Sequence, residues 1–248
     1  MKKFNPLTLT PLVSLAAAGA IGFSFAPAQA ATVTLADLFG GQTLLVGDKL
    51  FSNWILFADP GLIDYSQVTV TGLNDDPLNP GLLYDFGDQL SGSGVNISTI
   101  GTAFAFIVGV VNAPYLIEDT SLELKDYEVT GDGSLALVAG PFDLLGGGLL
   151  SAPVIVGANI DFDGNGLTTI PYADVKFTPQ EAIGVTNTAS AQTDDLGGTF
   201  ALKTFEQRFS QTPIPEGSPV LSLLVGAGAL GAGSAFSSVL KSRRKNNN

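Results

Sequence analysis

Alternation of apolar side chains with a period of two is the feature that most restricts how this chain can fold. Between residues 102 and 111, apolar side chains fill both alternating sets, which predicts an interior strand covered on both faces. Residues 122–127 begin with Leu122 and Leu124 on either side of Glu123, the pattern of a half-buried strand. Between the two ends of the chain, no segment has the spacing of a long amphipathic helix. The core is therefore expected to consist of strands.

Further runs of the same kind predict strands at residues 50–57, 68–73, 134–138, 154–156, 172–177, 182–186 and 199–209. In the last run the apolar set changes parity, which predicts a β-bulge near Lys203 and Thr204. Residues 36–39 and 178–182 predict short helical turns, and segments rich in Gly, Pro, Asn and Asp separate the runs. We expect an all-β fold, an antiparallel β-sandwich or jelly-roll-like single domain spanning residues 31–213.

The N-terminus has the organisation of an export signal. Lys2 and Lys3 precede an uncharged apolar stretch over residues 6–27, and Ala28 and Ala30 form an A-x-A cleavage site. We therefore predict a signal peptide, residues 1–30, that directs Sec-type export and is removed by signal peptidase. The small side chains at Ala28 and Ala30 favour this over the alternative, a retained N-terminal anchor.

The C-terminus contains a second apolar segment. Residues 220–240 carry no charge, and about 20 apolar residues suffice to cross a bilayer. The basic tail, residues 241–248, is expected to stay in the cytoplasm. A transmembrane helix at 220–240 accounts for this arrangement better than the alternative, a buried Gly- and Ala-rich core helix.

A short motif lies directly before this segment. Pro215, Glu216, Gly217 and Ser218, followed by the apolar span and by Arg243, Arg244 and Lys245, resemble the PEP-CTERM sorting signal of bacterial envelope proteins, in the form common in cyanobacteria. The resemblance covers residues 214–248 and residues 205–213 before them. It implies recognition by an exosortase, a membrane protease that cuts near the motif. The usual second Pro is Gly217 here, so the efficiency of processing stays open.

Composition excludes several classes of chemistry. The 248 residues include neither Cys nor His, which excludes disulfides, thiol nucleophiles, imidazole metal ligands and a Ser-His-Asp triad. Without the two ends, residues 31–213 keep 5 Lys and Arg against 22 Asp and Glu, a net charge of −17. That charge argues against nucleic acid as a partner.

One segment has the spacing of a calcium loop. Asp161, Asp163 and Asn165 supply oxygen ligands at positions 1, 3 and 5, and Gly166 takes position 6, as in the first half of an EF-hand loop. Position 12 is Tyr172, where a bidentate Glu is expected. Asp-Gly and Asn-Gly are also the usual residues of tight hairpin turns, so a calcium site and a plain turn both remain open.

Other candidate residues have simpler interpretations. Apolar neighbours of both parities surround Trp54, which favours core packing over a sugar-binding platform. Asp48 with Lys49 and Glu206 with Arg208 are most simply interpreted as solvated surface charges. No pair of carboxylates is singled out for glycoside hydrolysis, and no catalytic residue or cofactor is predicted.

These observations predict a non-catalytic β-sandwich exported to the cell envelope or extracellular matrix. Its expected role is adhesive or structural, with Ca²⁺ as an additional ligand to test. One alternative is a carbohydrate-binding module for envelope or extracellular polysaccharide, and another is a carboxylate-dependent glycan hydrolase.

Overall fold

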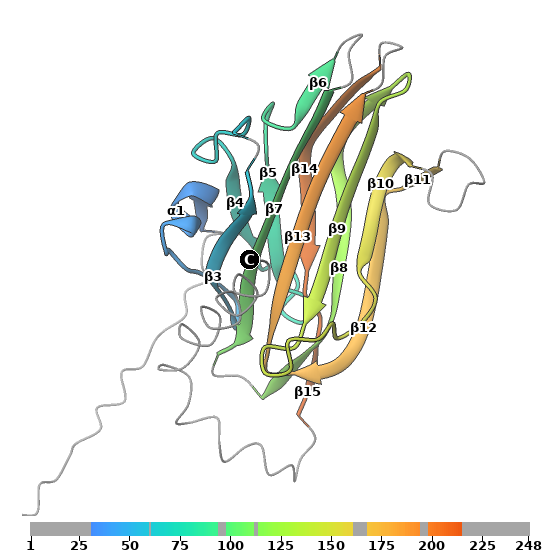
Figure 1. Ribbon diagram of the computed structural model, residues 1–248. Helices are drawn as coiled ribbons and strands as arrows, with labels where there is room; N and C mark the ends of the chain where they lie inside the picture. Colours follow the sequence, from blue (N-terminus) through green and yellow to red (C-terminus); the bar gives the residue numbers. More distant parts are fainter. Residues whose placement is uncertain are drawn as a thin grey trace, which may run out of the picture.

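The computed structural model describes residues 31–59, 61–93, 98–111, 114–160, 168–193 and 198–214. The predicted signal peptide, the calcium-loop residues Asp161, Asp163 and Asn165, and the sorting segment from Pro215 onward lie outside these residues. The described part of the chain is nearly all antiparallel β-sheet, arranged in two facing sheets (Figure 1).

The first sheet, called sheet A here, contains eight strands. Its main path runs in the order β1 (Thr32–Thr34), β4 (Thr69–Leu73), β5 (Gly81–Asp85), β14 (Thr199–Arg208), β8 (Tyr115–Thr130) and β12 (Tyr172–Gln180). Two short strands extend it, with β6 (Ser91–Ser93) paired to β14 and β15 (Gln211–Pro213) paired to β8. All of these pairings are antiparallel.

The second sheet, sheet B, contains seven strands. Their order is β11 (Thr168–Ile170), β10 (Val154–Ile160), β9 (Ser134–Phe142), β13 (Ala182–Thr193), β7 (Ser98–Val110), β3 (Lys49–Ala58) and β2 (Leu44–Val46). The interior strand predicted at residues 102–111 is β7, which lies between β13 and β3. In both sheets, many neighbouring strands come from segments that are far apart in the chain.

Aromatic side chains fill the space between the sheets. Trp54 is 5% exposed and stacks on Phe106 at a centroid distance of 4.4 Å, which confirms its predicted place in the core. Phe209, which directly follows β14, contacts Phe106 from the sheet A side at 6.2 Å. Such ring pairs add to the burial of apolar area, so the two sheets share one core.

The predicted parity change in β14 is present. The pairing of β14 with β8 shifts register on both sides of Thr204, so Leu202 and Phe205 both point into the core. A bulge inserts one residue and lets an odd spacing of apolar residues face one side. The prediction near Lys203 and Thr204 is confirmed.

Of the two predicted helical turns, one forms. The helix α1 (Leu35–Phe39) begins with a capping box in which the Thr34 hydroxyl accepts from the Asp37 backbone N–H at 3.1 Å. The turn predicted at residues 178–182 is wrong, because β12 continues to Gln180 and β13 begins at Ala182. Pairing of Gln180 with Ile117 of β8 and of Ala182 with Gly109 of β7 overrides the local preference there.

Within the described ranges, no helix has the length and apolar character needed to cross a bilayer.

Candidate functional site: the outer face of sheet A

The outer face of sheet A carries a row of paired side chains across the sheet that are polar at every position but Leu83. One row joins directly paired residues of six strands: Thr32, Thr71, Leu83, Glu206, Glu123 and Tyr172. With strands about 4.8 Å apart, five spacings make this row about 24 Å long. It runs straight across the strands, from the β1 edge to the β12 edge.

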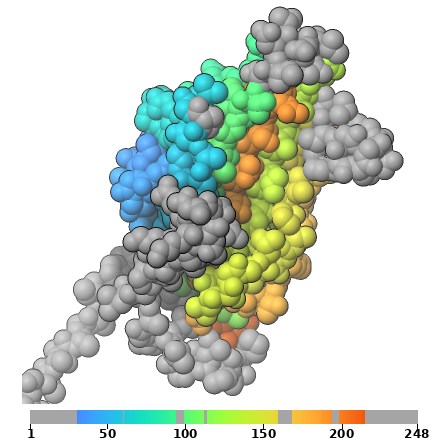
Figure 2. Space-filling view, in the orientation of Figure 1, coloured from blue at the N-terminus to red at the C-terminus, as the bar shows by residue number. Residues whose placement is uncertain are grey.

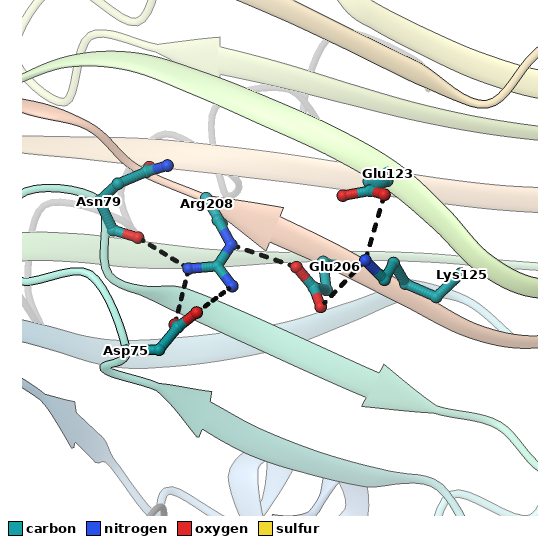
Figure 3. A network of polar contacts seen from close by, with 6 residues as sticks. All are labelled: Asp75, Asn79, Glu123, Lys125, Glu206 and Arg208. Carbon is teal, nitrogen blue, oxygen red and sulfur yellow. Dashed lines mark hydrogen bonds and ion pairs between the residues drawn. The ribbon is translucent and has the colours of Figure 1, made fainter.

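An ion-pair network occupies the middle of this face (Figure 3). The Arg208 guanidinium donates to both carboxylate oxygens of Asp75, at 2.8 and 3.1 Å, and its Nε donates to Glu206 at 3.1 Å. Arg208 also donates to the backbone carbonyl of Asn79 at 3.2 Å. A two-pronged contact of this kind fixes the guanidinium plane as well as its position.

Lys125 extends the network toward β12. Its ammonium group lies 3.1 Å from a carboxylate oxygen of Glu123 and 3.6 Å from one of Glu206. Glu123 and Glu206 are directly opposed across β8 and β14, an arrangement that repels when unshielded. The hydrogen bond to Glu123, together with both negative charges, raises the pKa of Lys125. The positive charge of Lys125 therefore offsets the repulsion between the neighbouring Glu123 and Glu206 carboxylates.

Arg208 has a similar effect on Asp75. Its hydrogen bonds lower the pKa of the Asp75 carboxyl, and Asp75 in turn contributes most to the raised pKa of Arg208. The side chains of Glu206 and Arg208 are only 15% and 17% exposed. Interpreting them as solvated surface charges was therefore wrong, since their neighbours on the sheet cover most of each side chain.

Tyr172 ends the row at the β12 edge. Its side chain is 52% exposed, and its backbone lies opposite Glu123. Partial desolvation raises the pKa of the Tyr172 phenol, and the negative charge of Asp174 adds to that rise. An exposed ring beside fixed polar groups offers a ligand both an apolar surface and hydrogen-bonding partners.

A second polar cluster lies at the end of the sandwich and is buried. The Lys49 ammonium is 0% exposed, lies 2.7 Å from Asp48 and donates to the Gln211 side chain of β15. Gln211 also donates to the Pro77 carbonyl at 2.9 Å. Burial lowers the pKa of Lys49, and the contact with Asp48 opposes that shift. The interpretation of Asp48 and Lys49 as surface charges was thus wrong for Lys49, which points inward beside Phe51.

The residues proposed from the sequence as ligands or sorting signals are not placed by the described ranges. They are Asp161, Asp163 and Asn165 of the calcium loop, Pro215, Glu216, Gly217, Ser218, Arg243, Arg244 and Lys245 of the sorting signal, and Ala28 and Ala30 of the cleavage site. Within the ranges that the structure describes, no group of three or more acidic side chains could hold a metal ion.

The network residues could not have been grouped from the sequence. Asp75 and Arg208 are 133 positions apart, and their contact depends on the pairing of β5 with β14. One local signal was present: in both Glu206 to Arg208 and Glu123 to Lys125, opposite charges are two positions apart in a strand and so share one face.

Comparison with known proteins gives little further information. No family model and no curated protein matches the chain. Among solved structures, one match is TmCBM61 in complex with beta-1,4-galactotriose, with 8% sequence identity and a TM-score of 0.24. The match covers 65% of this chain and 88% of that chain. A superposition this loose does not locate a binding site.

Proposed function

We propose that the chain is an exported, non-catalytic component of the cell envelope or extracellular matrix, with an adhesive or structural role. Its signal peptide directs export, its PEP-CTERM-like tag presents it to an exosortase-like protease, and the segment 220–240 holds it in the membrane at least until processing. The folded part attaches to matrix polymers through the outer face of sheet A.

The observation that supports this proposal is the row of paired outward side chains across sheet A, in which every residue but Leu83 is polar. Lys125 and Arg208 hold the Glu206 carboxylate in position from two sides, so its oxygens are oriented before a ligand arrives. Preorganised groups lose little entropy on binding. A straight row about 24 Å long fits an extended polymer better than a compact metabolite.

The alternative, a carbohydrate-binding module, is favoured by a different observation. Tyr172 is the exposed aromatic side chain on this row, and it lies beside the charged network rather than within it. Aromatic rings can pack against the apolar faces of sugars while nearby carboxylates accept from hydroxyl groups. A module would recognise one polysaccharide through Tyr172, whereas an adhesive face would bind several acidic or neutral polymers weakly.

Binding to matrix polysaccharide distinguishes these possibilities. Full chain in detergent is mixed with insoluble polysaccharide from the source cells, and the bound fraction is measured by co-sedimentation. We expect Glu206→Gln to lower the bound fraction several-fold and Glu181→Gln, the same change at an exposed position between β12 and β13, to leave it unchanged. Equal binding of both variants and the parent would refute the adhesive face.

A glycan array separates the module from the adhesive protein. Binding to a single glycan class that is lost in Tyr172→Ala supports the module, and weak binding to many polymers that survives this change supports adhesion. Release of reducing ends from any bound polymer would instead support the glycan hydrolase.

Calcium is proposed as an additional ligand at Asp161, Asp163 and Asn165. Three oxygen-bearing side chains at alternating positions suit a hard cation, and the acidic character of the chain adds long-range attraction. Titration calorimetry with Ca²⁺ on the full chain is expected to give a binding isotherm that Asp163→Asn weakens at least tenfold. No heat at millimolar Ca²⁺ would leave this segment as a plain turn.

A further inference from the structure

The outer face of sheet B differs from that of sheet A in one respect: it bears no ionisable side chain in the described strands. The outward positions are identified from strand register and burial: directly paired residues share a face, and the residues that alternate with these positions are buried in the core. They are Leu45 of β2; Leu50, Ser52, Ile55 and Ala58 of β3; Thr99, Gly101, Ala103, Ala105, Ile107 and Gly109 of β7; Ala182, Gly184, Thr186, Thr188, Ser190 and Gln192 of β13; Ser134, Ala136, Val138, Gly140 and Phe142 of β9; and Ile155 and Gly157 of β10.

This face is turned toward the viewer in Figure 1, with β13 in its middle. Figure 2 shows the coloured part of this side in space-filling form, with β13 in orange and β9 in yellow-green. Most of its side chains are small. Ala105 and Ile107 at its centre are already buried within the single chain, so a second copy would contact the positions around them, among which Thr188 and Gln192 of β13 are exposed. Larger apolar side chains are exposed around this centre, including Leu45, Phe57 and Leu149 at 50%, 46% and 63%.

The absence of charge on this face is significant because the rest of the domain is so acidic. Residues 31–213 carry a net charge of −17, so two copies repel each other over most of their surfaces. The charged side chains in the strands of sheet A include Asp85, Glu123, Glu206 and Asp174 on its outer face. If two copies meet through the outer faces of their B sheets, no like charges are placed in contact.

The size of this face is also adequate for an interface. Its five middle strands, about 4.8 Å apart and up to 13 residues long with a rise of about 3.3 Å per residue, cover on the order of 600–800 Å². A standard protein interface takes about 800 Å² from each partner. Small side chains leave the face flat, which lets two sheets pack closely.

We propose that the outer face of sheet B is an interface for a second copy of this chain, related by a two-fold axis near the middle of β13. Such a pair has four layers in the order A–B–B–A, so both outer faces of sheet A stay exposed at opposite sides. Two binding faces on one particle would let it bridge two polymers, a consequence that depends on the proposed adhesive function, whereas the pairing itself does not.

The absence of Cys makes this arrangement directly measurable. A nitroxide label is attached to the full chain in excess detergent through Thr188→Cys, an exposed position in the middle of β13, or through Asp174→Cys, an exposed position on sheet A. Pulsed dipolar spectroscopy then gives the distance between labels in a pair. Facing sheets are about 10 Å apart, so we expect about 10–20 Å at position 188 and 30 Å or more at position 174.

Other distances would identify other arrangements. A short distance at position 174 and a long one at 188 would show pairing through sheet A, and equal broad distributions would show association through the membrane segments alone. The absence of dipolar coupling at both positions would mean that no second copy is present, as when residues 220–240 cover this face within one chain. Each of these results overturns the proposal.

A charge at the centre of the face provides an independent test. Thr188→Glu places two like charges near the two-fold axis, so it is expected to raise the dissociation constant at least tenfold in analytical ultracentrifugation of the full chain. Thr71→Glu, which adds the same charge to the outer face of sheet A, is the matched control and is expected to leave the pair intact. Equal effects of the two changes contradict the proposed interface, and the label distances decide the matter if either variant fails to fold.

Discussion

Lys49 and Tyr84 are two of the large side chains that bring a polar group into the interior of the sandwich. The Lys49 ammonium is matched by Asp48 and Gln211, whereas the Tyr84 hydroxyl lies beside Asn187 but makes no hydrogen bond of ordinary geometry. Removing a buried polar group that has a partner is expected to destabilise the fold, whereas removing one that has no partner is expected to be tolerated. The two residues therefore make a natural comparison.

Replacing Lys49 is expected to destabilise the fold. Lys49→Met removes the cation and leaves the partly buried Asp48 carboxylate without its partner, at a cost of about 2–3 kcal/mol. The free energy of unfolding, measured by urea denaturation, should recover in part when Asp48→Asn is added. A loss below about 0.5 kcal/mol would show that this pair contributes little.

Replacing Tyr84 is expected to be tolerated. Tyr84→Phe removes a buried hydroxyl without a hydrogen-bond partner and should keep the free energy of unfolding within about 1 kcal/mol of the parent at neutral pH. A large loss would reveal a partner of the hydroxyl, such as an internal water.

The same variant has a predicted pH dependence. Burial raises the pKa of Tyr84 well above that of a free phenol, so above pH 10 the unfolded chain releases a proton that the folded chain retains. The parent therefore loses stability as the pH rises from 10, and Tyr84→Phe should lose less over the same range. Parallel urea midpoints of the two proteins between pH 9 and 11 would contradict this.

At the scale of strands, close packing on sheet B depends on a missing side chain. A Cβ atom at Gly184 of β13 would lie 2.0 Å from the ring of Phe142, which pairs with it on β9. Gly184→Ala is expected to lower the free energy of unfolding by about 1–3 kcal/mol, because the ring has to leave its place. The double variant with Phe142→Ala should be less destabilised than the sum of the two changes, measured by urea denaturation. Simple additivity would mean that the ring moves away without cost.

Strands were the part of the fold that local pattern could predict. Alternation within β7, β13 and β14 is a property of neighbouring residues, and the bulge in β14 left its mark in the spacing of Leu202 and Phe205. The network on sheet A could not be predicted, because Asp75 reaches Arg208 only after β5 pairs with β14. The burial of Lys49 could not be predicted for a similar reason, since its partner Gln211 lies 162 positions away in the chain.

At the scale of the whole molecule, the two sheets present outer faces of opposite character. The outer face of sheet A carries paired charges and the exposed Tyr172. In the described strands of sheet B, no ionisable side chain lies on the outer face. This division is the basis of the two proposals, ligand binding at the outer face of sheet A and self-association at the outer face of sheet B. The long-range negative field of the domain then keeps copies apart except where the neutral faces meet.

Sorting is also a property of the whole molecule. We propose that signal peptidase and an exosortase-like protease remove the two apolar ends, so intact-mass measurement of the native protein is expected to show a start at Ala31 and an end between Pro215 and Gly217. Finding Asn248 still attached would mean that the segment at 220–240 persists as a membrane anchor.

The central claim, attachment to matrix polymer through the outer face of sheet A, is tested most directly by carboxyl footprinting of the full chain. Carbodiimide labelling followed by mass spectrometry compares each carboxyl group with and without bound polysaccharide. Glu123 and Asp174, which lie on that face, are expected to lose reactivity several-fold, while Asp143, in the turn after β9, keeps it. Protection at Asp143 with no change at Glu123 and Asp174 would place the ligand elsewhere and contradict the claim.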